Sequence, residues 1–211
     1  MAEAAPAKPW AADFPKVTQF STFTKMKQDK EYSAAKGGDS KAAARLIRNI
    51  MGEGAQKETS QQKKIRALME KHPDATLLPV HAEEKAGRNE IPAMLAEYIA
   101  EKTGLEIDVD IIQTEKVGRI GSNAWYRMAN RAKFGGGVQQ GRKYILVDDV
   151  VARGGTFSDL RYYVENHGGE AVNMMSVGAG KFSTNIALSE KTRLALEERF
   201  GVKSLRNFLK K

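Results

Sequence analysis

The sequence contains no cysteine, which excludes a disulfide scaffold, a thiolate zinc site and a cysteine nucleophile. It also has no apolar run near the ~18 residues that a membrane-spanning helix needs, so we expect no contact with a membrane. The first residues, MAEAAPAKPW, lack the basic-then-apolar order of a secretory signal. Together these absences predict a cytoplasmic protein.

What the chain has in excess is positive charge. Its 211 residues include 34 Lys and Arg against 26 Asp and Glu, which gives a net charge of +8. Residues 1–72 hold 14 basic and 8 acidic residues, 73–140 hold 8 and 10, and 141–211 hold 12 and 8. The basic excess therefore lies in the two terminal thirds. It indicates either a solvated basic surface or a partner or substrate rich in phosphate.

Nucleic acid is one such partner, and short basic clusters such as Lys25, Lys27 and Lys30 lie on segments with a helical pattern. Because basic and acidic residues alternate there, we favour a solvated helical face over a nucleic-acid patch.

Apolar runs alternate with helical patterns along most of the chain, and this order predicts α/β units with a parallel sheet flanked by helices. The expected strands are 75–80, 107–112, 143–149 and 171–178. The expected helices are 41–51 after Asp39, one capped by Thr59 or Ser60, one capped by Asn89 and ended by Gly104, 156–168, Ser189 to Phe200, and a short one from Ser204. Hydrophobic content of 41% is enough for a core.

We divide the chain into a tail and helical extension at 1–72, which lies outside this alternation as a hood or partner surface, and a core with C-terminal helices at 73–211. Within the core, residues 113–140 form a long stretch without clear period. A stretch of this length in a compact domain is either functional or mobile.

Residues 145–157 read ILVDDVVARGGTF: an apolar strand, two adjacent carboxylates, a glycine turn and Thr156 at the start of a helix. Ligands bind at the carboxyl ends of strands in open α/β sheets, and a glycine turn at a helix N-terminus suits a phosphate. Asp148 and Asp149 would repel that phosphate. They suit sugar hydroxyls, a magnesium ion or a developing positive charge beside it. The pattern therefore predicts a site for a ribose 5-phosphate.

This segment resembles the signature of the type I phosphoribosyltransferases. In that family an apolar strand leads to two acidic residues, two variable positions, two small hydroxyl residues and Gly-Gly-Thr. Here Ala152 and Arg153 stand where the family often has Thr-Thr. Ala152 lacks one hydroxyl contact to the phosphate, and Arg153 either compensates with its charge or points to solvent.

The resemblance implies a type I phosphoribosyltransferase-like fold and assigns roles to these residues. Asp148 and Asp149 become the catalytic pair that binds the ribose hydroxyls, with magnesium held indirectly through ribose or water. The loop that holds the 5-phosphate consists of Ala152, Arg153, Gly154, Gly155 and Thr156.

Two further loops match the family by position. A pyrophosphate loop follows the first core strand and contains His81, Ala82, Lys85 and Arg88; His81 is equally well read as a structural histidine. A flexible loop lies between the next two strands and contains Lys116, Arg119 and Arg127.

By this resemblance the chain is expected to be a phosphoribosyltransferase of nucleotide metabolism. It would use phosphoribosyl pyrophosphate and magnesium to ribosylate a nitrogenous base that the sequence does not identify, and it would act as a homodimer. The alternative is a non-catalytic module that binds a nucleotide or phosphoribosyl pyrophosphate as a regulator, with RNA as a candidate partner of its basic ends. A third, weaker option is an accessory protein of a larger complex.

Overall fold

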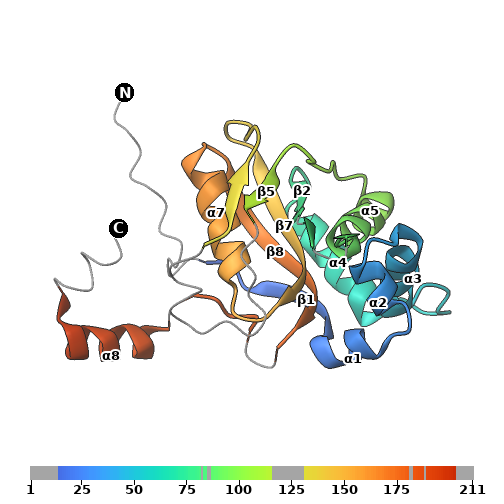
Figure 1. Cartoon of the computed structure of the whole chain (residues 1–211), viewed down its shortest axis with the longest axis horizontal. Coiled ribbons are helices and arrows are strands. Elements are labelled where there is room, and N and C mark those ends of the chain that lie inside the picture. The colour runs from blue at the N-terminus through green and yellow to red at the C-terminus, as the bar shows by residue number, and fades with distance from the viewer. Residues whose placement is uncertain are drawn as a thin grey trace.

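The computed structural model describes residues 14–81, 83–84, 87–115, 131–180, 183–187 and 189–202. Its helices are α1 (Phe23–Gln28), α2 (Tyr32–Lys36), α3 (Ser40–Met51), α4 (Ser60–Lys71), α5 (Ile91–Thr103), α7 (Gly155–Asn166) and α8 (Glu190–Phe200). Its strands are β1 (Val17–Thr22), β2 (Thr76–Pro79), β3 (Glu83–Glu84), β4 (Gly87–Arg88), β5 (Ile112–Glu115), β6 (Lys133–Gly135), β7 (Lys143–Val151) and β8 (Glu170–Ala179). Figure 1 shows their arrangement.

Four strands form the main sheet in the order β1-β8-β7-β2, and each neighbouring pair is parallel. The central strands read as nearly continuous apolar runs because helices cover both of their faces. β7, for example, is buried from Tyr144 through Asp149. The predicted α/β class, with a parallel sheet flanked by helices, is confirmed.

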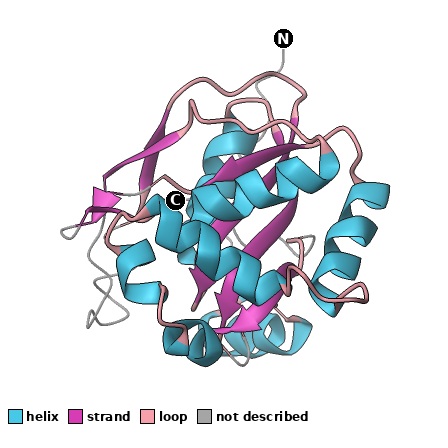
Figure 2. Cartoon of the chain, turned by 90° about the vertical axis from the view of Figure 1, so that its right-hand side faces the viewer, coloured by secondary structure: helices cyan, strands magenta, loops and turns pink. Residues whose placement is uncertain are grey.

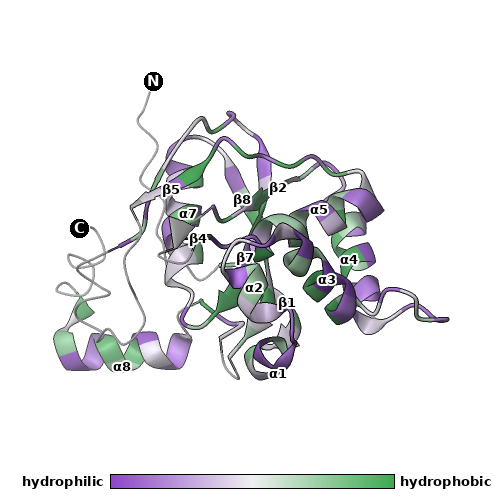
Figure 3. Cartoon of the chain, turned by 45° about the vertical axis from the view of Figure 1, so that its right-hand side comes forward, coloured by the Kyte–Doolittle hydropathy of each residue, from purple (hydrophilic) through white to green (hydrophobic). Residues whose placement is uncertain are grey.

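The two faces of the sheet bury separate hydrophobic cores. Helices α1 to α5 pack on one face through residues such as Leu46 and Leu95, against Val147 and Met175 of the sheet. Helix α7 covers the other face with Phe157 and other apolar side chains. Figure 2 is viewed from the side of α3 and α5, and helices lie across the front of the strands. In Figure 3 hydrophobic residues follow the central strands and hydrophilic ones the outer turns of helices such as α3.

The N-terminal third contributes to the sheet, which corrects the expectation that it is helical and lies outside the strand alternation. β1 pairs with β8 in parallel, with Val17 opposite Met174 and Thr22 opposite Ala179. The expected helices do follow β1. The division of the chain at residue 72 stays a prediction, but the described residues before it provide an edge strand and part of one core.

The strand expected at 107–112 is wrong in extent. Ile107 makes an isolated parallel bridge with Leu77, and the regular strand β5 begins only at Ile112. Between them Asp108 Oδ1 accepts a hydrogen bond from the Asp110 N–H at 2.9 Å. A carboxylate that bonds the backbone two residues ahead favours a turn, which ends the extended run. Part of the aperiodic stretch 113–140 is also a strand, because β5 pairs with β6 in antiparallel orientation.

The helix ends follow local capping chemistry. The predicted caps Asp39, Thr59, Gly104 and Ser189 are confirmed, and Thr59 forms a reciprocal capping box with Gln62. The cap predicted at Asn89 is displaced by one residue, to Glu90, while Asn89 Oδ1 accepts from the Ile91 N–H at 3.3 Å. The helix expected from Ser204 lies outside the described residues. None of the helices in the described ranges is long and apolar enough to cross a membrane.

Candidate functional site

The acidic pair lies at the carboxyl end of β7, at the edge of the sheet where a parallel α/β fold binds ligands. Both residues are buried, with 7% of Asp148 and 6% of Asp149 exposed. The Asp149 N–H donates to Asp148 Oδ1 at 2.8 Å, and the Val150 N–H donates to Asp149 Oδ1 at 2.7 Å. The predicted pair is therefore held against the backbone at the end of the strand and does not extend into solvent.

A cation from the N-terminal third completes this cluster. Lys36, the last residue of α2, places its Nζ 2.5 Å from Asp149 Oδ2. The two residues are 113 positions apart, and no local pattern in the sequence connects them. Sequence reasoning missed Lys36 for this reason.

The electrostatics of Asp148 differ from those of an exposed carboxylate. Burial raises the pKa of Asp148 well above its usual range, and the neighbouring charge of Asp149 acts in the same direction. Lys36 opposes this shift. A carboxyl that retains its proton to higher pH can donate as well as accept a hydrogen bond, which is useful in proton transfer.

The predicted phosphate loop connects β7 to α7. Ala152 and Arg153 are exposed, and Thr156 is half-buried in the first turn of the helix. Gly154 is the N-cap residue, with a left-handed φ of 72° and no side-chain cap bond. The first N–H groups of a helix have no acceptor within it, and the helix dipole is positive there. This turn therefore has backbone donors of the kind that a phosphate loop needs, and its binding of a phosphate stays a prediction.

Gly154 also has a packing role that the sequence did not indicate. A Cβ at this position would lie 2.6 Å from Ile186 Cδ1, so the glycine leaves room for Ile186. The same segment, 183–187, is tied to the loop because Ser183 Oγ donates to the Ala152 carbonyl at 2.6 Å. The space left by the missing Gly154 side chain is filled by protein, so it is not the space through which an anion approaches the loop.

The predicted pyrophosphate loop is described only in part. Ala82 and Lys85 lie outside the described residues, and β3 and β4 form a short antiparallel hairpin around the gap. The His81 carbonyl accepts from the Gln113 N–H at 3.1 Å. Burial lowers the pKa of His81, with Arg88 acting in the same direction, which fits a neutral, structural histidine.

Arg88 is exposed and its Nε lies 3.5 Å from Glu90 Oε1. Among the described residues, neither Arg88 nor His81 makes an ion pair or hydrogen bond with the acidic pair. The structure therefore brings Lys36, and not these two predicted residues, into contact with the carboxylates.

The predicted flexible-loop residues Lys116, Arg119 and Arg127 lie outside the described residues. The chain that follows them is anchored on α7. There the Arg131 Nε lies 2.5 Å from Asp159 Oδ1, and the Ala132 N–H donates to Asp159 Oδ2 at 3.0 Å. Asp159 is thus a buried acceptor that fixes this part of the chain one turn beyond the phosphate loop.

The donor set at the acidic pair does not make a complete direct metal site. In the described ranges no group of three or more His, Asp or Glu side chains is placed to hold a metal ion. Of the two carboxylates present, Asp149 is already paired with Lys36. Magnesium that is held indirectly, through ribose or water, stays a prediction.

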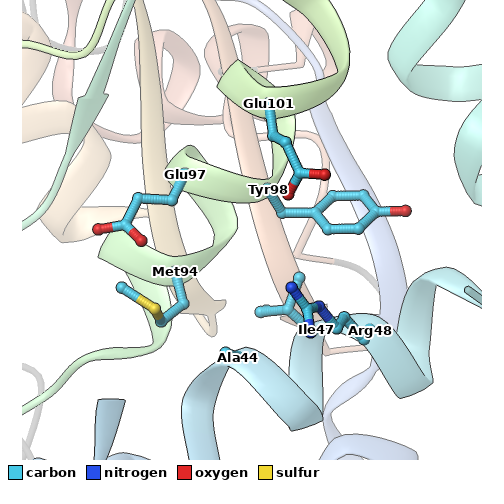
Figure 4. Close-up of a pocket in the computed structure, with 7 residues that line it drawn as sticks. All are labelled: Ala44, Ile47, Arg48, Met94, Glu97, Tyr98 and Glu101. Atoms are coloured by element: carbon cyan, nitrogen blue, oxygen red, sulfur yellow. The ribbon is translucent and has the colours of Figure 1, made fainter. Parts of the chain in front are cut away.

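A small cavity of about 80 Å³ lies elsewhere, between α3 and α5. Figure 4 shows Ala44, Ile47 and Arg48 on one helix facing Met94, Glu97, Tyr98 and Glu101 on the other. A shallower depression beside it, of about 630 Å³, includes Arg88 in its lining. Neither is lined by the acidic pair or the phosphate loop, so neither belongs to the site at the sheet edge.

Two known proteins are similar to this chain in sequence, and both are longer than it. No protein-family model matches the chain. Protein TraN of Escherichia coli is 37% identical over 193 residues, which cover 92% of this chain and 41% of TraN. An uncharacterised protein of Haemophilus influenzae is 30% identical over 155 residues, which cover 74% of this chain and 33% of that protein. The chain therefore spans less than half the length of both relatives.

Two solved structures match the chain with low TM-scores. UMP synthase of Leishmania donovani matches with a TM-score of 0.40 and 9% identity, over 78% of this chain and 33% of that chain. A purine phosphoribosyltransferase from Pyrococcus horikoshii matches with a TM-score of 0.37 and 16% identity, over 59% and 77%. Since both TM-scores are low, we draw no functional argument from these likenesses.

Proposed function

We propose that this chain is a phosphoribosyltransferase that uses phosphoribosyl pyrophosphate to ribosylate a nitrogenous base and releases pyrophosphate. One observation carries the proposal: two buried carboxylates, Asp148 and Asp149, lie in the last four residues of a parallel strand, and the next turn is the glycine-capped N-terminus of α7. The two acids lie five and six residues before Gly154, the N-cap residue of α7. The chain covers under half of each relative, so we make no proposal for a longer protein.

In the proposed reaction the bond between C1 of the ribose and the diphosphate oxygen breaks, and its electron pair leaves with pyrophosphate. A new bond forms between C1 and a nitrogen of the base, which then loses its proton. Positive charge develops on the ribose between these events. The carboxylate of Asp149 stabilises that charge, and backbone N–H groups at residues 152–156 hold the 5-phosphate away from it.

The remaining roles come from the family resemblance. Asp148 binds a ribose hydroxyl and is suited to proton transfer by its raised pKa. Lys85 and Arg88 assist the leaving pyrophosphate, and magnesium enters with the diphosphate, held through ribose or water. We also propose a cytoplasmic homodimer, with nucleic acid not favoured as a partner.

A second candidate is a regulatory module that binds a nucleotide or phosphoribosyl pyrophosphate without reacting. One observation favours it: Lys36 already neutralises Asp149. This contact restricts a carboxylate that a catalyst would keep open.

Pyrophosphate release separates the two candidates. The intact chain is incubated with phosphoribosyl pyrophosphate, magnesium and a panel of purine and pyrimidine bases. We expect release with at least one base, at least ~100-fold slower in an Asp148→Asn/Asp149→Asn variant and unchanged in Asp74→Asn, an exposed acidic control outside the site.

Thermal shift completes the experiment. A raised melting temperature with phosphoribosyl pyrophosphate but no release with any base would overturn the enzyme proposal and support the regulatory module. If neither phosphoribosyl pyrophosphate nor a nucleotide shifts the melting temperature, the site assignment itself is wrong.

A further inference from the structure

The contact between Lys36 and Asp149 is built into the fold. Lys36 ends α2, and the next residue, Gly37, donates its N–H to the Ser33 and Ala34 carbonyls. Ala35 is fully buried, and its carbonyl accepts from the Glu90 N–H at 3.4 Å. Backbone contacts on both sides of Lys36 thus deliver its side chain to the sheet edge, and the contact is not that of a loose tail.

Burial makes this ion pair different from the exposed pairs of the chain. The side chain of Asp149 is 9% exposed and that of Lys36 is 27% exposed, whereas the pair of Lys143 with Asp74 has exposures of 41% and 62%. An exposed pair is readily replaced by water and salt. Separating Lys36 from Asp149 is costlier, because the buried carboxylate of Asp149 would be left as an uncompensated charge.

We propose that Lys36 is a resident counter-ion that keeps divalent metal off the acidic pair until a phosphate ligand brings the metal with it. The inference rests on the proposed function for the identity of that ligand. The ammonium group occupies one oxygen of Asp149 and cancels the negative charge of that carboxylate, which would otherwise attract a cation. Magnesium and manganese need carboxylate oxygens that are free to enter a regular coordination shell, and they give up water reluctantly.

The consequence is conditional metal binding. Without Lys36 the acidic pair would carry one more unit of negative charge than it does in the free protein. A polyanionic ligand binds the metal through its own phosphate oxygens, so it does not need Asp149 to be released first. Lys36 thereby acts as a specificity-determining residue: it favours metal that arrives bound to a phosphate ligand over metal that arrives as the free ion.

Manganese binding to the intact chain tests this without any activity measurement. Free Mn²⁺ is measured by electron paramagnetic resonance in the absence of phosphate, for the wild type, Lys36→Met, Lys36→Gln and Lys36→Arg. We expect Lys36→Met and Lys36→Gln to bind one Mn²⁺ at least ~10-fold more tightly than the wild type and Lys36→Arg. Adding Asp149→Asn to Lys36→Met removes that gain, and the exposed control Lys41→Met behaves as the wild type.

Equal Mn²⁺ affinity in the wild type and in a folded Lys36→Met or Lys36→Gln chain would overturn the inference. A measurement on the wild type alone covers the case in which both variants unfold. Magnesium alone should leave the ¹H–¹⁵N signal of the Lys36 ammonium group unchanged, and a shift or loss of that signal would refute the proposal. Because neither measurement involves phosphoribosyl pyrophosphate, failure here is distinguishable from failure of the proposed function, which the pyrophosphate-release and melting experiments report.

Discussion

Ile186 packs directly against Gly154, at the point where the chain turns from β7 into α7. A Cβ on Gly154 would lie between 2.6 and 2.8 Å from three carbon atoms of the Ile186 side chain. Ile186 is itself buried in the core beneath α7. The segment after β8 and the loop after β7 therefore depend on one another, and the glycine is needed for this packing as well as for its left-handed φ.

Gly154→Ala should destabilise the protein more than Gly141→Ala. Both glycines have the same backbone strain, with φ values of 72° and 71°, but nothing lies within 4 Å of a Cβ at Gly141. The left-handed conformation costs each alanine about 1–2 kcal/mol. The overlap with Ile186 adds about 1–3 kcal/mol at position 154 alone. Urea denaturation of both variants measures the difference, and equal losses would contradict the packing role of Ile186.

Asp148→Asn should change the pH dependence of stability. The pKa of Asp148 is raised in the folded state, so the folded protein binds more protons than the unfolded chain between the usual aspartate pKa and the raised one. The free energy of unfolding contributed by Asp148 therefore falls as pH rises through this window. The asparagine variant does not titrate there, so it should gain stability relative to the wild type as pH rises. Thermal melts at several pH values measure this.

Asp74→Asn is a control for which we expect the opposite change of stability with pH. Its hydrogen bond with Lys143 lowers the pKa of Asp74, so its contribution is present above the usual aspartate pKa and is lost as pH falls. The Asp74→Asn variant should lose stability relative to the wild type as pH rises. The same direction of change in both variants would show that the assignment for Asp148 is incorrect.

Asp159→Ala should cost about 1–3 kcal/mol, because it leaves the Ala132 N–H without its acceptor and removes the partner of Arg131. Glu106→Ala removes an exposed pair with Arg142 and should stay within about 0.5 kcal/mol of the wild type. Urea denaturation compares the two. A small effect at Asp159 would mean that water readily replaces this anchor.

Ser176→Ala should leave stability unchanged or raise it by up to about 1 kcal/mol. Ser176 lies opposite Asp148 in the sheet, is fully buried, and its Oγ has no hydrogen-bond partner among the described residues. Ser158 is the matched control, since it is equally buried but its Oγ accepts from Arg131 at 3.5 Å. Ser158→Ala should lose about 0.5–1.5 kcal/mol in the same denaturation experiment. A loss at Ser176 as large as at Ser158 would indicate a hydrogen bond to water.

Local sequence chemistry was a good guide to the elements that carry the acidic pair. The apolar run that became β7, the glycine turn and α7 were all predicted, as were the caps at Asp39 and Thr59. These features depend on residues within about four positions of each other. The prediction of secondary structure was wrong in two places. It missed β1, which joins the sheet by pairing with the distant strand β8. It also made 107–112 one strand, although the turn at Asp108 interrupts it.

The sequence by itself determined the α/β class and the adjacency of two carboxylates to a glycine-capped helix, because both follow from side-chain periodicity and short-range backbone chemistry. Only the tertiary structure decided what surrounds them. Lys36 reaches Asp149 across 113 positions, and Ile186 reaches Gly154 from beyond the next strand. Such contacts arise from the packing of parallel strands and their connections at one edge of the sheet, and no local pattern records which residues that packing brings together.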